Sequence, residues 1–185
     1  DIYGCMGKLN EATAAWSKVR CEDNPETYAW AQFSLGNTYK TIGKLGENIA
    51  AWSNIRREYS CEAYAVAQYS LGNTHKTMDQ LDDAITAWSS IRRDDDPEAY
   101  AWAQLSLGDA YRTMDQSDNA IAAWSSIRRE DDPNAYAWAQ SSLGFAYQTQ
   151  NKLDEAITAW SNIRREDEPE LYAEAQRNLA LVNKH

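Results

Sequence analysis

This sequence of 185 residues lacks long hydrophobic runs and has no excess of basic charge. No run approaches the roughly 18 to 20 apolar residues that span a bilayer, and the opening DIYGCMGKLN lacks the basic-then-apolar order of a signal peptide. We therefore expect no membrane partner. The 18 basic and 28 acidic residues give a net charge of −10, which would repel a phosphate backbone and argues against nucleic acid as a partner.

Cysteine, glycine and proline are also scarce. Cys5, Cys21 and Cys61 are odd in number and form no C-x-x-C pair, which excludes a disulfide framework and a zinc site. We expect structural thiols in a reducing compartment, which favours the cytoplasm. The 8 glycines and 4 prolines disfavour a turn-rich β protein. Because the sequence also begins without Met, we expect a processed chain or a piece of a longer array.

The residues that are present recur with a period of 36, as from Trp16 to Trp52. Tyr28, Gln32, Leu35 and Val19 each begin a further series with the same step. A repeat of between 20 and 50 residues indicates a solenoid.

Each unit has the pattern of two helices. Apolar residues fall at helical spacing in residues 97–113 and again in residues 81–93. Asn24, Asp96 and Asp132 precede a proline, and Ser60 stands at the same place in the second unit, which predicts a side-chain cap at each first helix. The first helices should end at residues that tolerate a left-handed backbone, namely Gly43, Asp79, Asp115 and Asn151.

One glycine lies inside each complete first helix, where it costs about 1 kcal/mol relative to alanine. These glycines are Gly36, Gly72, Gly108 and Gly144. We expect the second helix to approach closely at these points, through the small residue twelve places further on (Ala84, Ala120 or Ala156). The last copy has Ala180 instead, and no second helix follows it in this sequence.

The residues Leu107, Gly108 and Tyr111, followed by Ala120, Trp124, Ile127 and Pro133, resemble the tetratricopeptide repeat (TPR) signature in a 36-residue variant. The resemblance recurs along essentially all of residues 1–185. It implies an all-α fold, a right-handed α-solenoid of stacked antiparallel helix pairs. The chain would be a single repeat domain that starts at the tail of a first helix and ends with an unpaired first helix. Sel1-like repeats share the longer period, but their extra glycines and alanine-rich second helix are absent.

No set of residues breaks the repeat to converge as a catalytic site, so we predict that the protein is not an enzyme and has no metal or cofactor. His75 occupies the slot of Tyr39, Tyr111 and Tyr147 and is interpreted as a packing residue; His185 is terminal. The paired arginines, such as Arg56 with Arg57, should close each second helix and form solvated ion pairs with the acids that follow. The recurrent glutamines should hydrogen-bond between helices.

The tryptophan series from Trp16 to Trp160 is predicted to be core by its spacing. A second stripe on the first helices, at i, i+3, i+7 and i+10, varies between repeats and is left unexplained by packing. We call it the variable stripe. Its members are Trp30, Phe33, Asn37 and Lys40; Val66, Tyr69, Asn73 and Lys76; Trp102, Leu105, Asp109 and Arg112; and Trp138, Ser141, Phe145 and Gln148.

In the family that the chain resembles, the corresponding face lines a concave groove that holds a peptide. The resemblance therefore implies a protein-interaction scaffold, with Asn37, Asn73, Lys40, Lys76 and Arg112 as donors to a partner of some acidic character. The alternative for the tryptophans of the stripe is packing between repeats. Two other functions stay open: head-to-tail self-association through complementary ends, which concentration-dependent light scattering would reveal, and a regulatory module of a larger enzyme.

Overall fold

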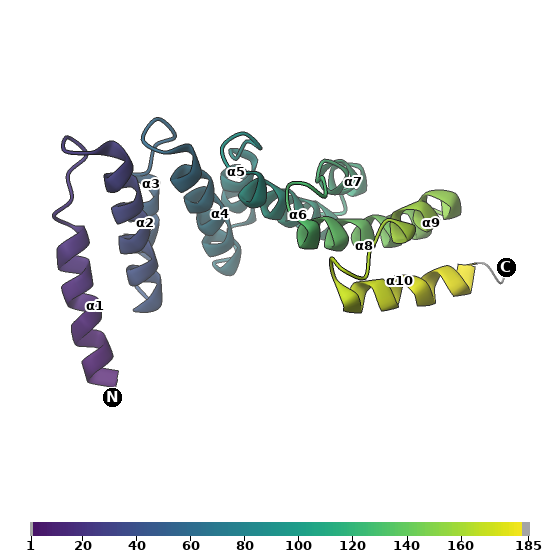
Figure 1. Cartoon of the computed structure of the whole chain (residues 1–185), viewed down its shortest axis with the longest axis horizontal. Coiled ribbons are helices and arrows are strands. Elements are labelled where there is room, and N and C mark those ends of the chain that lie inside the picture. The colour runs from purple at the N-terminus through teal and green to yellow at the C-terminus, as the bar shows by residue number, and fades with distance from the viewer. Residues whose placement is uncertain (1, 183–185) are drawn as a thin grey trace. The chain divides into compact units, whose positions relative to one another are not determined.

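A computed structural model describes residues 2–182, and its side chains from Lys8 onward except that of Asn10. It confirms the predicted class, an all-α solenoid built of antiparallel helix pairs (Figure 1). His185 and the side chain of Cys5 lie outside the described residues. Within residues 2–182 the helices are α1 Ile2–Trp16, α2 Pro25–Thr41, α3 Leu45–Ser53, α4 Cys61–Thr77, α5 Leu81–Ser89, α6 Pro97–Thr113, α7 Ser117–Ser125, α8 Pro133–Thr149, α9 Leu153–Ser161 and α10 Pro169–Val182.

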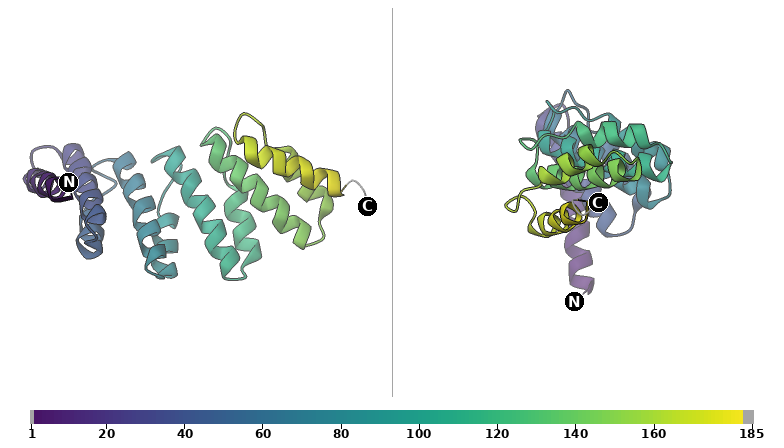
Figure 2. Two further views of the ribbon diagram at one scale, coloured as in Figure 1. Left: turned by 90° about the horizontal axis from the view of Figure 1, so that it is seen from below. Right: turned by 90° about the vertical axis from the view of Figure 1, so that its right-hand side faces the viewer.

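The chain divides into two compact units, residues 1–99 and 100–185. In the first unit, α2 pairs with α3 and α4 pairs with α5, while α3 and α2 both contact α4. In the second unit, α8 pairs with α9, and α10 lies beside both of them (Figures 1 and 2). No helix within residues 2–182 combines the length and the apolar character needed to cross a membrane.

The predicted caps are present. Asn24 accepts a hydrogen bond from the Thr27 N–H at 2.9 Å, and Asp96 accepts one from the Ala99 N–H at 2.8 Å. Two residues after each 17-residue helix the backbone is left-handed, with φ of 76° at Gly43 and 58° at Asp79, Asp115 and Asn151. These caps explain why each first helix begins and ends where the sequence indicates.

The second helices are shorter than predicted. α5 ends at Ser89, so Ile91 and the arginines after it belong to the connection and do not close the helix. Ile91 is nonetheless buried, with its N–H bonded to the Trp88 carbonyl at 3.2 Å. The connection from residue 54 to residue 60 and its later copies is therefore ordered by a buried isoleucine.

Four tryptophans form the centre of the core, and each is completely buried: Trp52, Trp88, Trp124 and Trp160. Each indole lies against the glycine sixteen residues earlier, where a Cβ would overlap the ring. The close approach predicted at these glycines is confirmed, but its agent is the indole and not the alanine twelve places on. In the first pair that place holds Asn48, whose Nδ2 donates to the Gly36 carbonyl at 2.9 Å.

Trp16 corrects the prediction that the whole tryptophan series is core. It is 39% exposed. α1 also runs unbroken from Ile2 to Trp16. In the later repeats the equivalent segment is interrupted by a turn, which in the first of them lies between Thr41 and Leu45.

Candidate functional site

In the first unit the variable stripe begins with aromatic rings that are already packed together. Trp30 meets Phe33 edge-on at 5.8 Å between ring centroids, and Phe33 stacks on the buried Trp52 at 6.0 Å. The Lys40 ammonium lies over the Trp52 ring, 5.7 Å from its centroid, and Asn37 is exposed one turn earlier. This part of the stripe therefore presents half-buried rings bordered by an amide and a cation.

On α4 the same stripe is less aromatic. Val66, Tyr69 and Asn73 are half-buried, and Lys76 is exposed in the last turn. The Tyr69 carbonyl accepts a hydrogen bond from Trp88 Nε1 at 3.3 Å, so the backbone beneath the stripe is tied to the core. His75, in that last turn, has its Nδ1 2.9 Å from Oε1 of Gln80, which gives the ring a structural partner.

In the second unit the stripe lines a cavity of about 450 Å³. α6 contributes Arg112, α8 contributes Trp138, Ser141 and Phe145, and α10 contributes Leu171 and Glu174 among the lining residues. Trp138 is 45% exposed and Phe145 is 39% exposed. Large exposed rings around a cavity are unusual for residues whose only role is packing. We call this cavity the α8–α10 pocket.

Of the remaining stripe residues in this unit, some pack against the core and the others lie at the surface. Trp102 and Leu105 are half-buried and pack against the core cluster that contains Trp124. Asp109 lies 3.8 Å from Arg112 in an exposed ion pair, and Gln148 is exposed beside a separate cavity. The two interpretations of the stripe tryptophans thus separate: Trp30 and Trp102 pack, whereas nearly half of Trp138 is exposed.

The α10 residues of the α8–α10 pocket, Leu171 and Glu174, were missed in the sequence, as were Ser142, Ala146 and Thr149 of α8. Glu174 is the fifth member of the series Trp30, Val66, Trp102 and Trp138, so extending the period by one more step would have found it. Leu171 stands where three of the earlier repeats have alanine, as at Ala135. Its larger side chain is 5% exposed and lines the pocket.

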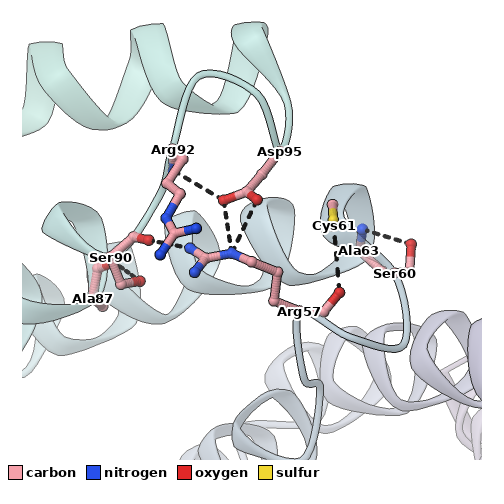
Figure 3. A network of polar contacts seen from close by, with 8 residues as sticks. All are labelled: Arg57, Ser60, Cys61, Ala63, Ala87, Ser90, Arg92 and Asp95. Atoms are coloured by element: carbon pink, nitrogen blue, oxygen red, sulfur yellow. Dashed lines mark hydrogen bonds and ion pairs between the residues drawn. The ribbon is translucent and has the colours of Figure 1, made fainter.

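The arginine pairs are not a ladder open to a polyanion. In three of the pairs the first arginine forms an exposed ion pair with the glutamate two residues on, as Arg56 does with Glu58 at 3.4 Å. The second arginine is partly buried and reaches the next repeat at Arg57 and Arg129, which corrects the expectation of solvated pairs for these two, whereas Arg165 is exposed. Arg57 contacts Asp95 and the Ser90 carbonyl (Figure 3). Its guanidinium also lies 4.6 Å from the Tyr64 ring centroid.

The same arrangement recurs in the second unit. Arg129 pairs with Asp167, donates to the Asn162 carbonyl at 2.6 Å and lies 4.9 Å from the Tyr136 ring centroid. Asn162, the residue that caps the C-terminus of α9, also donates from Nδ2 to Oε1 of Gln140 in α8 at 3.2 Å, so this recurrent glutamine does bond to the neighbouring helix end. These polar groups hold the repeats together and leave the variable stripe as the candidate binding surface.

No group of three or more His, Cys, Asp and Glu side chains placed to hold a metal ion occurs among the residues that the structure describes. The lining of the α8–α10 pocket is mixed in character. It combines aromatic rings, serine hydroxyls and one charge of each sign, a mixture typical of a surface that holds a partner side chain.

The fold and the pocket define a TPR-like helical-repeat protein. Two crystal structures of MamA, a protein that contains tetratricopeptide repeats, are similar to this chain. One is 25% identical with a TM-score of 0.61 and covers 97% of this chain and 95% of its own; the other is 26% identical with a TM-score of 0.60 and covers 90% and 86%. No protein-family model and no curated protein matches the sequence. The likeness supports a fold of the kind used by protein-interaction scaffolds.

Proposed function

We propose that the protein is a non-enzymatic scaffold that binds a peptide segment of a partner protein along its variable stripe. The observation that carries the proposal is the exposure of Trp138 and Phe145 around the α8–α10 pocket. Tryptophan and arginine are enriched among the residues that dominate binding energy, and Arg112 lines the same pocket. A partner side chain that entered the pocket would remove both rings from water.

The first unit would contribute polar contacts. Asn37 and Lys40 on α2, with Asn73 and Lys76 on α4, place two amides and two cations on the same faces as the half-buried rings. These groups donate hydrogen bonds, which suits carboxylates and backbone carbonyls of a peptide. A partner segment with some acidic character would match them.

A peptide-display selection on the immobilised protein tests this function. Enriched peptides would then be measured against Trp138→Ala and against the charge reversal Lys40→Glu with Lys76→Glu. We expect Trp138→Ala to weaken binding by at least about tenfold, the scale of a hot-spot residue. The charge reversal should weaken acidic peptides specifically.

Matched variants are available for both changes. Trp16→Ala removes another exposed tryptophan, and Lys18→Glu with Lys44→Glu reverses two lysines outside the stripe. If the selected peptides bound all of these proteins equally well, the variable stripe would not be the binding surface.

A further inference from the structure

The α8–α10 pocket holds opposite charges on helices that are not adjacent in sequence. Arg112 is in the last turn of α6, and Glu174 lies in α10. Trp138, Ser141 and Phe145 of α8 line the same cavity, and the buried Leu171 adds an aliphatic surface. An apolar recess thus has a cation and a carboxylate among its lining groups.

The size of the pocket limits what enters it. A volume of about 450 Å³ is in the range of pockets that take small ligands, so it suits one bulky side chain and the adjoining backbone. The edge-on contact between Phe145 and the buried Trp160, at 5.6 Å between centroids, holds one ring against the core. The lining is therefore firm on this side, and a leucine-sized side chain buried against it is removed from water.

The two charges specify the neighbours of that side chain. The Arg112 guanidinium is mostly exposed, and its contact with Asp109, at 3.8 Å, is the long, solvated kind that contributes little. Arg112 therefore favours a carboxylate on the ligand. Glu174 would repel a second carboxylate in the same pocket and favours a base.

We propose that the α8–α10 pocket selects a three-residue pattern within a peptide: an acidic residue, a bulky apolar residue and a basic residue. The apolar side chain lies against Trp138 and Phe145, the acid pairs with Arg112 and the base pairs with Glu174. This inference rests on the proposed function and narrows it, because the first unit alone would favour acidic segments whereas this pocket requires one charge of each sign.

The test uses the whole chain and four fluorescein-labelled peptides with identical Gly-Ser flanks and the centres Asp-Leu-Lys, Asp-Ala-Lys, Asp-Leu-Glu and Lys-Leu-Lys. Binding is measured by fluorescence anisotropy up to 1 mM protein. We expect Asp-Leu-Lys to bind about tenfold more tightly than Asp-Ala-Lys, the factor that the buried leucine methyl groups supply. It should bind about two- to fivefold more tightly than either like-charged peptide, as rim ion pairs allow.

Two variants assign the charges. Glu174→Lys should transfer the preference to Asp-Leu-Glu, and Arg112→Glu should transfer it to Lys-Leu-Lys. Glu155→Lys makes the same charge change on α9, away from this pocket, and should leave the preference unchanged. Circular dichroism melting curves confirm that each variant is folded.

The outcomes separate this inference from the proposed function. If Trp138→Ala weakened all four peptides while Glu174→Lys changed no preference, the pocket would bind peptides and the charge pattern would be wrong. If none of the four peptides bound, this pattern would be refuted. It would also be refuted if all four bound Trp138→Ala as tightly as they bind the unchanged protein. The display selection would still decide whether the stripe binds other peptides.

Discussion

Arg57 Nε lies 2.9 Å from Oδ1 and 3.0 Å from Oδ2 of Asp95, a residue 38 positions later in the next repeat (Figure 3). The Asp95 side chain is 5% exposed and also accepts a hydrogen bond from the Arg92 N–H at 3.0 Å. Arg57 in turn donates to the Ser90 carbonyl at 2.6 Å. The Asp95 carboxylate thus bonds both within its own connecting segment and to the preceding repeat. Replacing it therefore tests how much this contact contributes to stability.

Asp95→Ala should destabilise the first unit. It leaves the partly buried Arg57 guanidinium without its carboxylate and removes the bond to the Arg92 N–H, so we expect the free energy of unfolding in urea to fall by about 2–3 kcal/mol. Asp94→Ala is the control, because Asp94 is exposed in the same connection and should change the value by less than about 0.5 kcal/mol. Equal effects of the two variants would show that the pair is only a surface contact.

A second prediction concerns the glycines beneath the tryptophans. An alanine in a helix normally stabilises relative to glycine, but at Gly72 the added Cβ would overlap the Trp88 indole. We expect Gly72→Ala to lower the free energy of unfolding by about 1–3 kcal/mol, the usual cost of overpacking. Gly46→Ala, in α3 with nothing within 4 Å of the new Cβ, should instead be stabilising by up to about 1 kcal/mol.

The decisive result is that the two substitutions change the free energy of unfolding in opposite directions. Urea titration together with thermal melting measures both changes. A stabilising Gly72→Ala would mean that the indole moves freely, and that the glycine is retained for some reason other than close approach.

The tryptophan series offers a third prediction. Trp52 is completely buried, and replacing it with alanine should cost about 3–5 kcal/mol through lost burial and the cavity left behind. Trp16 has the same place in the period but is 39% exposed, so Trp16→Ala should cost less than about 1 kcal/mol. Similar costs for both, measured by urea unfolding, would restore the view that the whole series is core.

The contrast between Trp16 and Trp52 shows how far the sequence could be interpreted. Period, helix pairs and caps follow from local chemistry, as at Asn24 and Asp96, and these were predicted correctly. The contacts between side chains of different helices could not be predicted from the sequence. Spacing alone could not tell that an indole and not an alanine covers Gly36, or that Arg57 would cross 38 residues to Asp95.

The variable stripe shows the same limit. A period identifies which positions share a face, but exposure depends on the neighbours of each copy. Trp102 and Trp138 are equivalent in sequence, yet Trp102 packs against the core cluster and Trp138 lies open beside a pocket. On α10 the next position of the series holds Glu174, whose side chain lines that pocket with Trp138.

The last prediction concerns the first junction between repeats, where other residues replace the arginine and the aspartate that pair at the later junctions. Cys21 and Tyr59 stand at the positions of Arg57 and Asp95, again 38 residues apart. Their side-chain hydrogen bond is the main cause that raises the pKa of the Tyr59 phenol above its usual value. Tyr59 also meets Tyr28 edge-on at 6.0 Å between centroids, where the later junctions place a guanidinium over the equivalent ring.

The double variant Cys21→Arg with Tyr59→Asp should recreate the pair of the later junctions. We expect each single change to lower the melting temperature, since it introduces one charge without its partner, and the double variant to recover above both singles. A double-mutant cycle from urea unfolding measures this coupling. If the two changes were simply additive, the 38-residue pairing would depend on its surroundings in the later repeats and not on the two side chains themselves.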